Sequence, residues 1–162
     1  ADYEGPVYLR FGRPKWPIFT DPNQKFEIGK ALKLIEGTDV TIFATGHLVW
    51  KAIEAEAILQ EQGISAEVIN IHTIKPLDEK AILASVAKTG CAVSAEEHQM
   101  AGGLGESIAS TLARNDMKPL EIVAVNDQFG ESGKPEELLD KYGLSTENIV
   151  EKAKKAIQRK NS

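Results

Sequence analysis

Three titratable residues, Glu96, Glu97 and His98, stand together directly after a short apolar run at residues 91–95. Carboxylates and an imidazole can act as general acids and bases or as metal ligands. No second histidine or cysteine stands at ligand spacing from them, and no nucleophile motif accompanies them. The triplet therefore indicates polar groups that fix a loop or face a partner, with acid–base chemistry and a zinc site as the weaker alternatives.

Three glycines follow the triplet, Gly102, Gly103 and Gly105, and apolar residues then take up helical spacing. A glycine turn between a strand and a helix can cradle a pyrophosphate. Here the pattern Gly-x-Gly-x-x-Gly is incomplete, and the two preceding carboxylates would repel a phosphate. The glycines therefore predict a tight turn and a close approach of the helix to a sheet, and nucleotide binding is the weaker alternative.

Two arginines, Arg10 and Arg13, flank Gly12 near the start of the chain. Guanidinium groups near a strand end suit a phosphate or a carboxylate, but the residues alone favour a pair of surface arginines. The run at 7–11 predicts a strand, and the proline-bearing stretch at 12–24 predicts an extended linker. A strand and a linker ahead of a domain suggest a fragment or one subunit of a split protein.

The elements that must position these residues alternate along the chain. Apolar and β-branched runs predict strands at 32–35, 40–45, 66–71, 91–95 and 120–125. Helical spacing and capping residues predict helices at 47–62, 78–88, 105–115, 136–142 and from 145 towards the C-terminus. This alternation predicts a three-layer α/β/α domain with a mostly parallel five-stranded sheet.

Each of the three histidines, His47, His72 and His98, follows a different predicted strand. The carboxyl ends of parallel strands meet at one edge of a sheet, and ligands of open α/β sheets bind there. We therefore expect a polar rim at this edge, for which a zinc site is a weak interpretation.

The composition is that of one globular domain. The chain has 162 residues and a formal net charge of −5, and it has no basic run that would suggest nucleic acid. No apolar stretch approaches the ~20 residues of a membrane helix. A single cysteine, Cys91, excludes an internal disulfide and is predicted to be a buried core residue, which fits a reducing, cytoplasmic location.

Six stretches of the chain together resemble the C-terminal end of transketolases. They occur in the family's order and cover nearly the whole chain, at residues 5–14, 26–31, 40–46, 72–78, 96–106 and 129–144. Deoxyxylulose-phosphate synthases and the β subunits of 2-oxoacid dehydrogenases share this domain. The Glu-Glu-His triplet and the Ser-Gly-Lys-Pro loop resemble transketolase more than either.

The resemblance implies that residues 1–22 are the last strand and exit linker of a pyrimidine-binding domain. Residues 23–162 would be a transketolase C-terminal domain. The complete enzyme would be a homodimer of the pentose phosphate pathway that moves a two-carbon ketol unit between sugar phosphates. Thiamine diphosphate with Mg²⁺ or Ca²⁺ would sit in N-terminal domains or a partner subunit, because this sequence lacks the family's cofactor motifs. The isolated chain is therefore expected to hold no cofactor and to be inactive.

Within the resemblance, Arg13 matches the arginine that contacts the substrate's terminal phosphate, and no catalytic residue is implied. Glu96, Glu97 and His98 match no residues of known chemical role, so our hypothesis is that they face the other domains or the second subunit. Two alternatives stay open. The chain could be the matching part of a deoxyxylulose-phosphate synthase or 2-oxoacid dehydrogenase, or a stand-alone module that binds an anion or a nucleotide.

Overall fold

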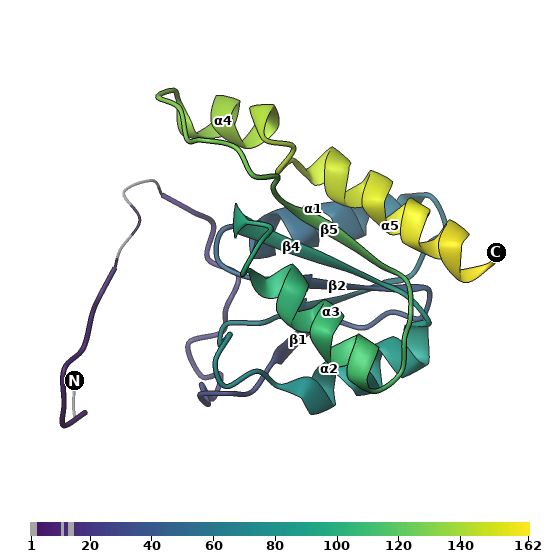
Figure 1. Cartoon of the computed structure of the whole chain (residues 1–162), viewed down its shortest axis with the longest axis horizontal. Helices are drawn as coiled ribbons and strands as arrows, with labels where there is room; N and C mark the ends of the chain where they lie inside the picture. Colours follow the sequence, from purple (N-terminus) through teal and green to yellow (C-terminus); the bar gives the residue numbers. More distant parts are fainter. Residues whose placement is uncertain (1–2, 11, 13–14) are drawn as a thin grey trace.

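The body of the protein is a five-stranded sheet covered by helices on both faces, as seen in a computed structural model that describes residues 3–10, 12 and 15–162 (Figure 1). The strands are β1 (Leu32–Ile35), β2 (Val40–Ala44), β3 (Ala66–Asn70), β4 (Ala92–Gln99) and β5 (Leu120–Val125). The helices are α1 (Leu48–Glu61), α2 (Glu79–Thr89), α3 (Leu104–Arg114), α4 (Pro135–Lys141) and α5 (Thr146–Lys160). The predicted three-layer α/β/α fold is confirmed.

The strand order is β1-β3-β2-β4-β5. Strands β3, β2, β4 and β5 are parallel, and only the edge strand β1 runs antiparallel to its neighbour β3. Helices α1 and α5 pack together on one face, and α2 and α3 pack together on the other (Figure 1). The sheet is therefore mostly parallel, as the alternation of elements predicts.

Each face of the sheet has its own apolar core, and β2 contributes to both. Val40, Ile42 and Ala44 lie in the core with α1 and α5, whereas Phe43 lies in the core with α2 and α3. Successive side chains of a strand point to opposite faces, so a central strand must be apolar on both. Cys91 is fully buried in the first core, as predicted, and burial raises the pKa of its thiol.

The helix boundaries follow the predicted capping residues. Asp78 Oδ1 accepts a hydrogen bond from Ala81 N at 3.2 Å, and Ser145 Oγ accepts one from Asn148 N at 3.2 Å. Pro135 stands in the first turn of α4, where its missing N–H leaves no bond unmade. Among the described residues, no helix combines the length and apolar character needed to cross a bilayer.

Two predicted features are wrong. The strand predicted at 7–11 is not formed at residues 7–10, because the described chain places no neighbouring strand beside them to supply ladder hydrogen bonds, and residue 11 lies outside the described residues. Strand β4 does not stop at residue 95 but continues to Gln99, which pairs with Val125 of β5. The Glu96, Glu97 and His98 triplet therefore forms the end of a strand and not a loop.

The strand order reverses between β2 and β4. The chain leaves β2 through α1 towards β3 on one side, and leaves β4 through α3 towards β5 on the other. Connections that diverge to opposite faces open a crevice at the carboxyl ends of the two strands, and such crevices are the usual ligand sites of open α/β sheets. This edge is therefore where the fold favours a functional site.

Candidate functional site at the carboxyl edge of the sheet

A pocket of about 490 Å³ opens at the carboxyl ends of β2 and β4. Three segments line it: the N-terminal segment, the turn between β2 and α1, and the end of β4. Its lining residues are Arg10, Gly12, Thr45, Gly46, His47, Glu96, Glu97 and His98. The structure therefore brings the predicted triplet together with one of the two other histidines.

Glu96 directs its carboxylate at the N-terminus of α3. Its Oε2 accepts a hydrogen bond from Leu104 N at 2.7 Å, and its Oε1 accepts one from Gly105 N at 2.8 Å. Glu96 is only 2% exposed. The free N–H groups and the dipole of a helix N-terminus favour an anion, so this is where a nucleotide phosphate would bind. The protein's own carboxylate fills that place, which argues against the nucleotide-binding alternative.

The lack of space around Glu96 explains why glycines stand there and confirms the predicted tight turn and close packing. A Cβ at Gly103 would overlap the Glu96 carboxylate, and a Cβ at Gly105 would lie 2.8 Å from Ile122 Cγ2 on β5. Gly102 has a positive φ of 76°, which glycine adopts without strain. These residues let α3 approach the sheet and receive the carboxylate.

Glu97 points away from Glu96, towards the turn after β2. Its Oε2 is hydrogen-bonded to His47 Nδ1. The His47 imidazole also stacks on the indole of Trp16, with ring centroids 4.3 Å apart and an interplanar angle of 21°. A Cβ at Gly12 would lie 3.2 Å from His47 Nε2, so the ring also lies close to that part of the backbone. We call Trp16, His47 and Glu97 the linker clamp, because they join the linker, α1 and β4.

The other two histidines take no part in the clamp. His98 is exposed, and its Nδ1 lies 3.0 Å from Gln99 O. His72 Nδ1 lies 2.9 Å from Thr73 Oγ1, and its ring is 4.5 Å from that of Phe26 beside a separate pocket of about 420 Å³. The three histidines share an edge of the sheet, as expected, but not one site.

The predicted phosphate-binding residue, Arg13, lies outside the described residues, whereas Arg10 lines the pocket. Sequence reasoning missed Trp16 and its contact with His47. The available signal was a tryptophan beside Pro17 in a stretch that otherwise has linker composition. A large aromatic residue in a linker usually needs a surface on which to pack.

The described residues do not fit thiamine diphosphate and its metal ion. Within residues 3–10, 12 and 15–162, no group of three His, Cys, Asp or Glu side chains is placed to hold a metal. The N-terminus of α3, which could otherwise receive a diphosphate, holds the Glu96 carboxylate. No cofactor chemistry is therefore assigned to these residues.

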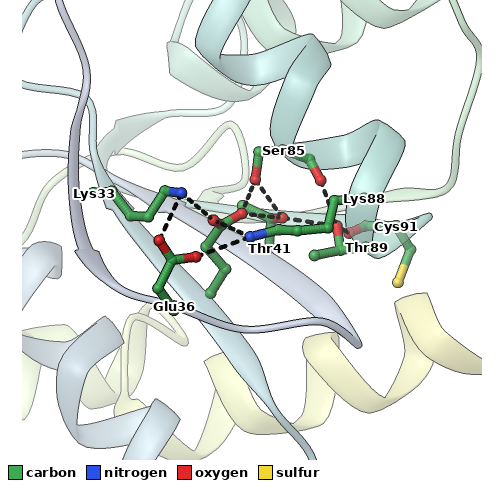
Figure 2. A network of polar contacts seen from close by, with 8 residues as sticks. Lys33, Glu36, Thr41, Ser85, Lys88, Thr89 and Cys91 are labelled. Carbon is green, nitrogen blue, oxygen red and sulfur yellow. Dashed lines mark hydrogen bonds and ion pairs between the residues drawn. The ribbon is translucent and has the colours of Figure 1, made fainter.

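A second polar cluster lies at the opposite, amino edge of the sheet, where side chains of β1 and α2 converge (Figure 2). The fully buried side chain of Glu67 lies 2.6 Å from Lys88 Nζ and 3.3 Å from Lys33 Nζ. Glu36 bridges the same two lysines, at 2.9 Å from Lys33 and 3.1 Å from Lys88. Two carboxylates balance two ammonium groups, so this cluster ties β1, β3 and α2 together and presents no surplus charge to a ligand.

The Glu67 carboxylate stays charged despite its burial. Burial raises the pKa of Glu67, but hydrogen bonds from Lys88 and Ser85 and the charge of Lys88 together lower it by more. The net pKa of this carboxyl is therefore below its ordinary value. Buried charges persist in proteins when they are paired and hydrogen-bonded in this way.

Comparison with known proteins identifies one family and several similar chains. The family model described as "Transketolase, C-terminal domain" matches residues 29–149. The chain is 46% identical over 159 residues to the 6-deoxy-6-sulfo-D-fructose transketolase subunit SqwH of Clostridium sp. (strain MSTE9), covering 98% of this chain and 49% of that protein. It is 37% identical over 160 residues to an apulose-4-phosphate transketolase subunit of Phocaeicola vulgatus, covering 98% of this chain and 51% of that protein.

Among solved structures, the chain is similar to one described as a split-gene transketolase in the form of an inactive β4 tetramer. The TM-score is 0.86 with 42% sequence identity, and the match covers 89% of this chain and 47% of that chain. The chain thus spans about half the length of the curated relatives it matches.

Proposed function

We propose that this chain, which belongs to the transketolase C-terminal domain family, is the C-terminal section of a split transketolase. It assembles with an N-terminal partner, and the complete enzyme transfers a two-carbon ketol unit from a ketose to an aldose. The observation that carries this proposal is the similarity, over most of the chain, to the solved split-gene transketolase. Because that protein is described as inactive, we expect this chain alone to be inactive too.

The partner binds, in this proposal, at the carboxyl edge of the sheet and along the N-terminal segment. Residues 3–10 are extended, and Val7, Tyr8 and Leu9 are 61%, 88% and 71% exposed. An exposed apolar segment of this kind can add as a strand to a sheet of another chain. This supports assigning residues 1–22 to the end of a preceding domain and its linker, and residues 23–162 to the C-terminal domain.

The exposed residues at this edge also suit a partner there. Glu97 and His98 are exposed at the end of β4, whereas Glu96 is buried within the chain. A partner chain seated at this edge would therefore face Glu97 and His98.

The N-terminal partner would hold thiamine diphosphate with Mg²⁺ or Ca²⁺, since the described residues of this chain form no binding site for the metal ion. Two relatives are named for sugars that carry an anionic group, a sulfonate in one and a phosphate in the other. We therefore expect a sugar substrate with such a group. Arg13 would bind the anionic group, because a guanidinium offers paired donors to phosphate and sulfonate oxygens.

The test is to express the chain and its N-terminal partner separately and together. Calorimetry measures thiamine diphosphate binding, and an enzymatic assay compares xylulose 5-phosphate with pyruvate as the donor. We expect cofactor binding and ketol transfer from xylulose 5-phosphate only in the mixture. Pyruvate turnover would instead favour the deoxyxylulose-phosphate synthase or 2-oxoacid dehydrogenase alternative. Cofactor binding or activity of the isolated chain would contradict the proposal.

The role of Arg13 is tested in the same mixture. The Arg13→Ala change should raise KM for a phosphorylated donor by roughly tenfold or more, because a charge-assisted pair is lost, and should affect kcat much less. Lys15→Ala, which removes a nearby positive charge, is the matched control. Equal effects of both changes would show that Arg13 acts only through the general charge of the segment.

A further inference from the structure

We infer that His47 is a positioning residue: through the linker clamp, it sets the path by which the N-terminal segment leaves the domain and thereby controls assembly with the partner. Only the last step of this inference, the control of assembly, rests on the proposed function. The positioning itself concerns this chain alone.

The stack between Trp16 and His47 fixes the indole to the domain. The two rings are nearly parallel, with centroids 4.3 Å apart. A stacked pair restrains both the separation and the tilt of the rings. His47 is the N-cap residue of α1, so its backbone is fixed to the body of the domain. Through the stack, the body of the domain therefore determines where Trp16 lies.

Glu97 orients the His47 ring. The His47 side chain does not cap α1 but is hydrogen-bonded through Nδ1 to Glu97 on β4. A ring held by packing on one side and by a hydrogen bond on another keeps one orientation. The sheet thus determines the plane on which the indole of Trp16 rests.

Among the described residues of the linker, Trp16 and Phe19 are the ones that pack against the apolar core, whereas the upstream residues 3–10 are exposed. His47 contacts Trp16 on one side and approaches the backbone at Gly12 on another. One side chain therefore lies against two of the places where the segment meets the domain.

His47 also borders two cavities. His47 and Glu97 line both the 490 Å³ pocket and an apolar pocket of about 390 Å³, whose walls include Leu138 and Tyr142. Trp16 lines the second pocket as well. Removing the imidazole would take away the stacking surface of the indole and leave more space beside it in the apolar pocket, so that the indole would turn and the segment upstream would follow a different path.

The test uses the chain with Trp50→Phe, so that Trp16 is its only fluorophore of that kind. Two variants, His47→Ala and Glu97→Gln, are compared with His98→Ala, the matched control at a neighbouring histidine outside the clamp. In His47→Ala we expect a shift in Trp16 emission and roughly 2- to 12-fold faster tryptic cleavage after Lys15, the range that corresponds to loss of one aromatic pair. Glu97→Gln should give a smaller change in the same direction, and His98→Ala none.

Two further measurements distinguish a positioning role of His47 from a general loss of stability. The thermal midpoint of Glu97→Gln should stay within the range of His98→Ala, and His47→Phe, which keeps a stacking ring, should restore slow cleavage. If His47→Ala is cleaved no faster than His98→Ala, or if His47→Phe fails to restore slow cleavage, the positioning role is overturned.

Assembly is measured as the Kd for the N-terminal partner, which should weaken in His47→Ala by about the same factor as cleavage accelerates. If cleavage after Lys15 becomes faster in His47→Ala but the Kd for the partner is unchanged, His47 does not control assembly. If the unmodified chain does not bind the partner at all, the proposed function fails, and the cleavage and emission data still decide the positioning role.

Discussion

At the scale of single residues, two neighbouring glutamates have different structural roles. Glu96 and Glu97 are adjacent on β4, and successive side chains of a strand point to opposite sides. Glu96 is therefore buried against the N-terminus of α3, while Glu97 reaches the exposed side and meets His47. Burial and the available partner, not the residue type, assign the role of each carboxylate.

The first prediction concerns the buried carboxylate. Glu96→Gln should lower the free energy of unfolding by about 1–3 kcal/mol, because an amide presents an N–H₂ group to one of the two N–H donors of α3 and leaves a buried donor unpaired. Urea denaturation measures the loss, with Glu151→Gln on the exposed side of α5 as the control. Equal stability of the two variants would contradict the capping role.

The second prediction concerns the pH dependence of stability at Glu67. Its folded pKa is below its ordinary value of 4.5, so the folded protein binds fewer protons than the unfolded chain at acid pH. The stabilisation is present above pH 4.5 and is lost as the pH falls through the folded pKa. Glu67→Gln should therefore flatten the acidic part of the curve of unfolding free energy against pH.

The control for Glu67 is Glu61→Gln, a change at an exposed carboxylate in the last turn of α1. Denaturant titrations at several pH values from neutral to about 3 give the comparison. If the unfolding free energy falls equally steeply with acid pH in Glu67→Gln and in the unmodified protein, the charge of Glu67 does not stabilise the fold.

At the scale of elements, the contact between α3 and the sheet depends on the absence of side chains. Gly105 lies where a methyl group would meet Ile122 and Ser94, and Gly103 lies where one would meet the Glu96 carboxylate. The helix therefore lies closer to β4 and β5 than any other residue type would permit at these positions. This closeness brings the helix N-terminus within reach of Glu96.

The third prediction follows from that closeness. Gly105→Ala should destabilise the protein by about 1–3 kcal/mol, since an added methyl group must displace a packed helix. Gly130→Ala is the control, because nothing lies within 4 Å of a Cβ there and its φ is not positive. Chemical denaturation of both variants measures the difference, and equal stabilities would show that α3 shifts without penalty.

At the scale of the whole molecule, the last residues of α5 close the amino edge of the sheet. Lys160 Nζ donates hydrogen bonds to Asp39 O at 2.8 Å and to Thr89 O at 3.0 Å. Thr89 is the last residue of α2, whose C-terminal dipole favours a cation. One side chain thus joins three segments that are distant in the sequence.

The fourth prediction tests this closure. Lys160→Met keeps much of the apolar length of the side chain and removes the charge, so the free energy of unfolding should fall by about 1–2 kcal/mol as two charge-assisted hydrogen bonds are lost. Lys154→Met, at an exposed position of the same helix, should have little effect. A loss of the same size in both variants would mean that α5 is not held through this contact.

The fold could be predicted because its signals are local. The apolar runs of β2 and β3, the capping side chain of Asp78 and the proline at the start of α4 each act within a few residues. The end of β4 could not be predicted, because the strand is prolonged through the polar residues Glu97 and His98 by the position of β5. The ladder between the two strands is irregular after Ala95 and resumes where Gln99 pairs with Val125. Residues 7–10 show the converse, because an apolar run forms no strand without a neighbouring strand.

The sequence by itself determined the class of the fold, the order of its elements and the edge at which its polar residues gather, because periodicity and capping are properties of neighbouring residues. Only the tertiary structure decided that Glu96 fills the N-terminus of α3, that Glu97 orients His47, and that His47 supports Trp16. These contacts join groups up to 50 residues apart, and their partners are chosen by packing.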